Sequence, residues 1–102
     1  MTPWRVDIPP HVAAVLRTLH PDLKKVIKAA VRAIALQPDL GDPLRGELAE
    51  LRKFRVRRFR IIYQAEARSR TVRLLAVGPR RTVYEDLAAA LKPPAGKPRS
   101  RG

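Results

Sequence analysis

The stretch that decides the fold is Leu51–Gln64, LRKFRVRRFRIIYQ. It mixes basic residues with strand-forming apolar and aromatic residues, and it contains no acidic residue. A two-residue turn at Arg57-Arg58 makes it a β-hairpin in which Val56 lies opposite Phe59. The same register sets three further pairs opposite each other, which are Arg55 with Arg60, Phe54 with Ile61 and Lys53 with Ile62.

Because side chains alternate between the two faces of a strand, this register predicts one apolar face and one basic face. The apolar face carries Phe54, Val56, Phe59, Ile61 and Tyr63, and the basic face carries Lys53, Arg55 and Arg60. Like charges opposite each other destabilise a sheet, so the basic face is expected to bind an anion such as phosphate. Arginine is unfavourable in a type I′ turn, and a wider turn would shift the register by one and exchange the two faces.

The composition indicates one small domain with an acidic partner. The chain has 102 residues, a formal net charge of +13 and a pI near 11.6. Such a charge favours binding to nucleic acid, an anionic membrane surface or an acidic protein. The absence of cysteine excludes disulfides, thiolate catalysis and cysteine-based metal sites. No secretory signal or membrane-spanning stretch is recognised, so we expect a cytoplasmic protein without a membrane partner.

The remaining elements follow from apolar spacing and from proline and glycine positions. In order, we expect a strand at Trp4–Ile8, a helix carrying Val12 to Leu19, a helix at Leu23–Ile34, a loop at Pro38–Gly46, the hairpin, a strand at Thr71–Val77, and a helix that begins at the capping-box residues Thr82 and Glu85. This is an α+β fold of order β-α-α-β-β-β-α, with the two helices covering one face of an antiparallel sheet and the basic face open. Residues 1–91 form the domain, and the basic tail of residues 92–102 is expected to be disordered.

Familiar catalytic constellations are missing from the sequence. The two histidines have no partners at metal-ligand spacing, and the acidic residues are scattered, so we expect neither a metal nor a cofactor. The candidate site is therefore the basic face together with Arg80, Arg81 and Tyr84, which follow the last strand. A tyrosine beside guanidinium groups can stack on a base. The residues alone equally allow a generic nucleic-acid-binding face, with Tyr84 packed against the edge of the sheet.

Two motifs at a fixed distance then resemble the RelE/ParE superfamily of bacterial type II toxins. They are FRVRRFRIIY at residues 54–63 and VGPRRTVY at residues 77–84, preceded by PLRGELAEL at residues 43–51. The resemblance covers the chain from the first strand to about Leu91 and includes the order of elements. It implies a RelE-like fold and, on the RelE-like branch, a ribosome-dependent mRNA interferase that cuts RNA by attack of its own 2′-hydroxyl.

The resemblance also implies roles for individual residues. Lys53 or Arg55 assists removal of the 2′-hydroxyl proton, Arg60 holds the phosphate, Arg80 stabilises developing charge and assists the leaving group, and Tyr84 stacks on or orients a base. The basic residues Arg52, Arg57, Arg58 and Arg81 are expected to contact RNA.

The resemblance leaves other functions open. One is inhibition of DNA gyrase, as in ParE-type members, another is a nucleic-acid-binding module without activity, and a third is a degenerate toxin. As partners, it implies messenger RNA on the ribosome and an antitoxin with an acidic binding segment. The toxin alone is expected to be a monomer that forms a hetero-oligomer with the antitoxin.

Overall fold

A computed structural model describes residues 2–48 and 50–91. Its elements in chain order are β1 (Arg5–Asp7), α1 (Pro10–Arg17), α2 (Pro21–Leu36), β2 (Asp42–Pro43), a 3₁₀ turn (Gly46–Leu48), β3 (Leu51–Val56), β4 (Phe59–Glu66), β5 (Thr71–Pro79) and α3 (Val83–Leu91). The α+β fold and the order of its main elements are confirmed, and β2 and the 3₁₀ turn are additions within and just after the predicted loop. The predicted disordered tail lies outside the described residues.

The five strands form one sheet in the order β1-β5-β4-β3-β2. The hairpin register predicted from the sequence is confirmed, with Val56 opposite Phe59 and Arg55 opposite Arg60. Only the first turn residue, Arg57, has a positive φ, at 58°. A type I′ turn needs positive φ at both central positions. The turn therefore closes over two residues with a single strained arginine, and the register does not slip.

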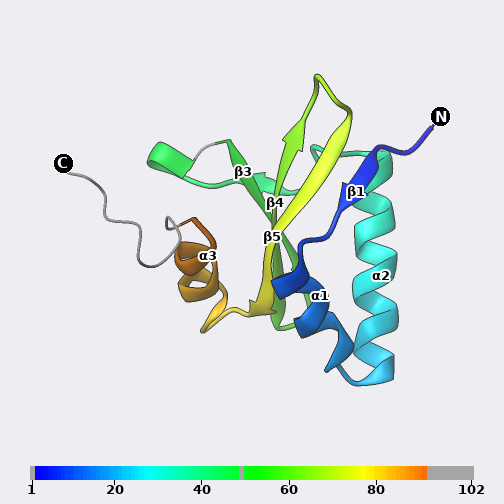
Figure 1. The fold of residues 1–102 in the computed structure, drawn as a ribbon, viewed down its shortest axis with the longest axis vertical. Coiled ribbons are helices and arrows are strands. Elements are labelled where there is room, and N and C mark those ends of the chain that lie inside the picture. The colour runs from blue at the N-terminus through cyan, green and yellow to red at the C-terminus, as the bar shows by residue number, and fades with distance from the viewer. Residues whose placement is uncertain (1, 49, 92–102) are drawn as a thin grey trace.

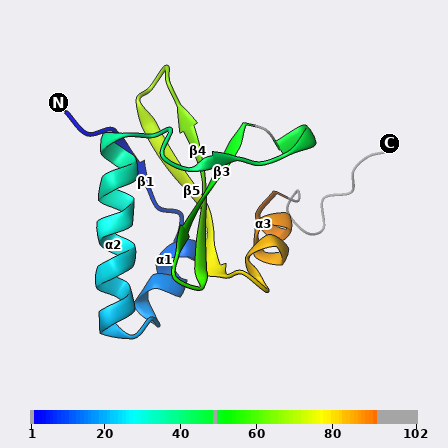
Figure 2. The ribbon, with the colours of Figure 1, turned by 180° about the vertical axis from the view of Figure 1, so that it is seen from behind.

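Helices lie on both faces of the sheet (Figure 1), and the same arrangement is seen from behind in Figure 2. The α1 and α2 helices cover the apolar face, where the main core is formed by ten buried side chains. These are Val12, Ile27, Ala30, Ile34, Val56, Ile61, Tyr63, Val72, Leu74 and Val77. The prediction that the helical pair covers this face is confirmed.

The opposite face is not the open basic surface that we expected from the sequence. Part of it is a second core under α3, formed by Leu51, Ile62, Ala76, Val83 and Leu87. The hairpin alone could not reveal this, because α3 reaches the face only after β5 has been placed. Lys53, Arg55 and Arg60 therefore share this face with α3.

Local sequence signals explain where the helices begin and end. Proline stands at the first position of α1 and of α2, where its missing N–H costs nothing. The His20 side chain accepts a hydrogen bond from the Asp22 N–H and caps α2, which ends two residues before Pro38. At the start of α3, the Glu85 and Asp86 N–H groups donate hydrogen bonds to the Thr82 carbonyl. Among the described residues, no helix is long and apolar enough to cross a membrane.

The loop after α2 is fixed to the sheet by Tyr63. This side chain donates a hydrogen bond to the Pro38 carbonyl at 2.7 Å and accepts one from the Gly41 N–H at 2.8 Å. Arg52 donates to the Gly41 carbonyl at 2.6 Å. Burial raises the pKa of the Tyr63 hydroxyl. The loop leads directly into β2, where Asp42 pairs with Lys53, so this network fixes one border of the basic face.

Candidate nucleic-acid interface

Cross-strand pairing arranges the basic face in rows. Arg55 on β3, Arg60 on β4 and Gly78 on β5 lie opposite one another, so they share one face. In the next row, Lys53 lies opposite Ile62. Arg55 is exposed, whereas Lys53 and Arg60 are half-buried. The three predicted basic residues therefore lie on one face, beside the second core.

The segment after β5 adds further arginines at the tip of the hairpin. The Arg80 N–H donates to the Arg58 carbonyl at 3.0 Å, which joins this segment to the turn. A pocket of about 570 Å³ opens there, lined by Arg57, Arg58, Phe59, Arg60, Pro79, Arg80 and Arg81. Five of these seven side chains are guanidinium groups. The structure thus brings Arg80 and Arg81 to Arg60, as the sequence predicts, whereas Lys53 and Arg55 do not line this pocket.

The arginines of this pocket have no carboxylate partner in the part of the chain that the structure describes. The ion pairs found there join Arg73 to Asp7 and Glu66. Guanidinium groups only donate hydrogen bonds, and a planar donor pair matches a phosphate. Within residues 2–48 and 50–91, no group of three or more acidic or histidine side chains could hold a metal ion. The pocket is suited to an anion with many acceptor oxygens, as in a nucleic-acid backbone.

Two predicted site residues are not brought into this pocket. Tyr84 is 41% exposed in the first turn of α3, but it is not among the lining residues. Arg52 lies opposite Tyr63, which belongs to the main core, so it points away from the face of Lys53, Arg55 and Arg60. Side-chain alternation predicts this placement of Arg52, since it is adjacent to Lys53.

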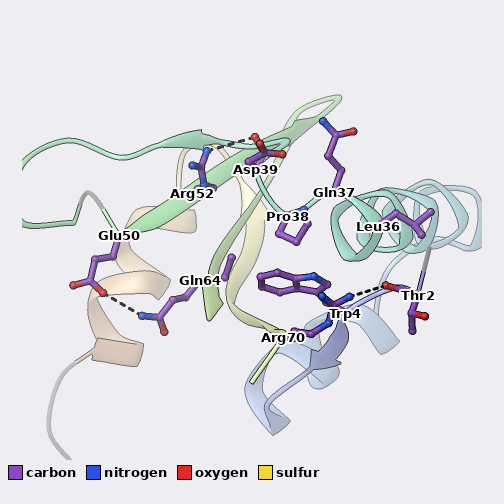
Figure 3. Close-up of a pocket in the computed structure, with 11 residues that line it drawn as sticks. Thr2, Trp4, Leu36, Gln37, Pro38, Asp39, Glu50, Arg52, Gln64 and Arg70 are labelled. Carbon is purple, nitrogen blue, oxygen red and sulfur yellow. Dashed lines mark hydrogen bonds between the residues drawn. The ribbon is translucent and has the colours of Figure 1, made fainter. Parts of the chain in front are cut away.

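Arg52 instead borders a different pocket, of about 720 Å³, at the end of α2 (Figure 3). Trp4, Leu36 and Pro38 give it an apolar part, and the Arg70 guanidinium lies 5.6 Å from the centre of the Trp4 ring. Sequence reasoning missed this pocket, because its walls come from the segment before β1, the end of α2, the β3–β4 pair and the turn between β4 and β5.

The chain is similar to known proteins both in its sequence family and in its fold. Residues 6–88 match the family described as ParE-like toxin of type II bacterial toxin–antitoxin system. No curated protein matches the sequence. A chain of the RelBE2 toxin–antitoxin complex from Mycobacterium tuberculosis is 27% identical, with a TM-score of 0.70 over 78% of this chain and 94% of that chain.

More distant structures agree in fold. A mutant of the E. coli toxin RelE in the free state is 19% identical, with a TM-score of 0.74 over 89% of this chain and all of that chain. The archaeal RelE–RelB complex from Pyrococcus horikoshii gives 21% identity and a TM-score of 0.64, over 78% of this chain and 97% of that chain. At these identities the likeness shows a RelE-like fold. Together with the family match, it establishes that the chain belongs to the ParE-like toxins of type II bacterial toxin–antitoxin systems.

Proposed function

We propose that this toxin is a ribosome-dependent mRNA interferase, a metal-independent endoribonuclease that cuts messenger RNA by attack of the RNA 2′-hydroxyl. The observation that supports it best is the row of Arg55 and Arg60 that continues into the arginine pocket of Arg80 and Arg81. Such a surface binds the backbone of RNA and stabilises the extra negative charge that forms on the phosphate in the transition state.

Each side chain has a role that fits its chemistry. Arg60, half-buried beside the pocket, holds the phosphate, and Arg80 stabilises charge on the phosphate and on the leaving oxygen. Lys53 or Arg55 assists removal of the 2′-hydroxyl proton through positive charge. Tyr84 is exposed and can stack on a base that lies across α3. Arg57, Arg58 and Arg81 contact the RNA on either side.

Dependence on the ribosome follows from the exposed character of the site. The exposed part of the face, which carries Arg55, provides few contacts that orient the 2′-hydroxyl in line with the leaving oxygen, and orientation accounts for a large part of such a rate. A ribosome that holds the message in place would supply it. We also propose an antitoxin partner with an acidic binding segment, because the chain carries 22 basic and only 9 acidic residues. Complexes with RelB antitoxins among the similar structures support that partner.

Gyrase inhibition is the second candidate function, because the matching family is described as ParE-like. The two functions predict different damage in cells. An interferase cuts translated messages and leaves DNA replication to continue, whereas a gyrase inhibitor stalls replication and leaves messages intact.

The test is to induce the chain in growing cells and to map mRNA ends by primer extension. Arg60→Ala and Tyr84→Phe are the site variants, and Arg32→Ala on the exposed side of α2 is the matched control for the loss of one charge. We expect cuts at fixed codon positions that persist in Arg32→Ala and disappear in Arg60→Ala. Purified ribosomes carrying a message with one 2′-deoxynucleotide at the cut position should remain uncut.

Other outcomes separate the alternatives. Growth arrest with intact messages and stalled replication would establish gyrase inhibition and reject the interferase. Absence of toxicity would favour the inert nucleic-acid-binding module or the degenerate toxin. Cutting of the 2′-deoxy message would reject attack by the 2′-hydroxyl while leaving an endonuclease.

A further inference from the structure

One carboxylate lies on the basic face beside the Arg55–Arg60 row. A Cβ atom built on Gly78 would lie 3.4 Å from Oδ2 of Asp86 and 3.9 Å from the Thr82 hydroxyl. Gly78 is directly opposite Arg60, and side chains of opposite residues share one face. The start of α3 therefore lies on this face, with the Asp86 carboxylate in the place where a third side chain of the row would be.

Asp86 lies close to the Arg55–Arg60 row but forms no ion pair with it. Neighbouring strands are about 5 Å apart, so the β4 strand with Arg60 lies one spacing from Gly78. Asp86 is exposed and forms no ion pair within 4 Å among the described residues. On its other side it borders a pocket with His11, but the His11 ring is hydrogen-bonded to the Leu75 carbonyl at 2.8 Å. The carboxylate is thus available to a ligand bound on the row.

Cleavage by a 2′-hydroxyl needs a proton acceptor, and the arginines cannot provide one. Guanidinium groups remain protonated in proteins and have no acceptor atom. A carboxylate is an established general base for such a proton. Among the described carboxylates, Asp42 also lies on this face. It is on β2, opposite Lys53 in the strand register, and therefore on the side of β3 that faces away from β4 and Arg60. Asp86 is on the side where Arg60, Arg80 and Arg81 would hold the phosphate.

We propose that Asp86 is a catalytic residue that accepts the 2′-hydroxyl proton, an inference that rests on the proposed interferase function. The proton moves to the Asp86 carboxylate while the 2′-oxygen forms a bond to the adjacent phosphorus. The bond from phosphorus to the 5′-oxygen breaks, and that oxygen takes a proton from solvent. Asp86 then returns its proton to solvent. The products are a 2′,3′-cyclic phosphate and a 5′-hydroxyl, and no further reactant is needed.

With Asp86 as the proton acceptor, Gly78 also has a function. A glycine in this row leaves space between Arg60 and Asp86 that any larger residue would occupy. Among the described glycines only Gly46 has a positive φ, so backbone conformation does not require glycine at residue 78. An added methyl group would be in ordinary contact with Asp86, so Gly78→Ala should fold and yet obstruct the site.

The experiment measures chemistry and binding separately on purified ribosomes with a labelled message. Single-turnover cleavage rates and toxin–ribosome affinities are compared for the wild type, Asp86→Asn, Asp86→Glu and Gly78→Ala. Glu85→Gln is the matched control, because it removes one exposed charge from the same helix turn. Asp42→Asn tests the other carboxylate of the face. Circular dichroism melting curves verify that each variant is folded.

We expect Asp86→Asn to lower the cleavage rate by about 100-fold or more, as for loss of a general base. Its ribosome affinity should be unchanged or tighter, because a negative charge near RNA has been removed. A merely structural role would not separate the two quantities in this way. Asp86→Glu should recover part of the rate, and Glu85→Gln should remain close to the wild type.

Two results would overturn the inference while leaving the proposed function intact. One is an active wild type with an equally active Asp86→Asn, and the other is a loss of rate in Asp42→Asn in place of Asp86→Asn. If the wild type itself does not cut messages on the ribosome, the proposed function fails first and takes this inference with it.

Discussion

Replacing Gly41 by alanine should be the most destabilising small change in the loop that borders the basic face. The added Cβ would lie 2.7 Å from the Lys53 carbonyl oxygen and 2.8 Å from the Tyr63 hydroxyl. The first atom belongs to a strand backbone and the second to a fully buried ring, so neither can move away cheaply. The loop must therefore separate from the sheet and lose three hydrogen bonds, those of Tyr63 with Pro38 and Gly41 and that of Arg52 with Gly41. At about 1 kcal/mol for each neutral bond and up to about 3 for the charged one, the expected loss is about 3–5 kcal/mol.

Urea unfolding followed by circular dichroism measures this free energy, and a small domain should also melt at least about 12 °C lower. Gly46→Ala is the control, because Gly46 has φ +66° and no atom within 4 Å of an added Cβ. That variant should lose only about 1 kcal/mol, from backbone strain alone. If Gly41→Ala is no less stable than Gly46→Ala, the attachment of the loop through Tyr63 is not what holds it.

Three further outcomes are expected. Arg57→Gly should stabilise the domain by roughly 0.5 kcal/mol in urea unfolding, because glycine removes the strain of φ 58°, and a destabilised variant would contradict the turn geometry. Burial raises the pKa of Tyr63, so its contribution to stability is complete below its ordinary pKa near 10 and is lost as pH rises through the higher folded value. Urea midpoints from pH 8 to 11 should show this alkaline loss unchanged in Tyr84→Phe and absent in Tyr63→Phe. Lys53→Ala should reduce the slope of log affinity against log salt for single-stranded RNA by about 0.7 in anisotropy titrations, and an equal reduction in Lys25→Ala would indicate nonspecific charge.

The sequence was most informative where structure depends on neighbours along the chain. The pairing of Arg55 with Arg60 follows from a two-residue turn and strand alternation, both of which are local rules. The helix boundaries follow from prolines in the same way. For Arg52, the same alternation predicts a place on the opposite face from Lys53, because neighbouring strand residues point to opposite faces.

Features that depend on contacts between distant segments could not be found in this way. The parallel pairing of β1 with β5 joins residues more than sixty positions apart, and no local pattern specifies it. Leu75 forms a bulge in β5, so that Ile62 pairs with Ala76 whereas Tyr63 pairs with Leu74. The extra residue shifts the alternation of β5, and both Leu74 before the bulge and Val77 after it face the main core. The placement of Asp86 depends on that bulge, on the end of β5 and on the direction of α3 together.

The position of α3 links the stability of the second core to the composition of the site. Its buried residues Val83 and Leu87 hold the helix on the sheet, while Asp86 in its first turn borders the basic face. This second core has only five buried side chains, compared with ten in the main core, so α3 should separate from the sheet at a lower free-energy cost than α2. Separation would remove Asp86 from the basic face but leave Lys53, Arg55 and Arg60 in place. Under the proposed function, RNA binding would therefore rest on the arginines of the sheet and cleavage would also require α3, so that displacement of α3 would abolish cleavage without covering those arginines.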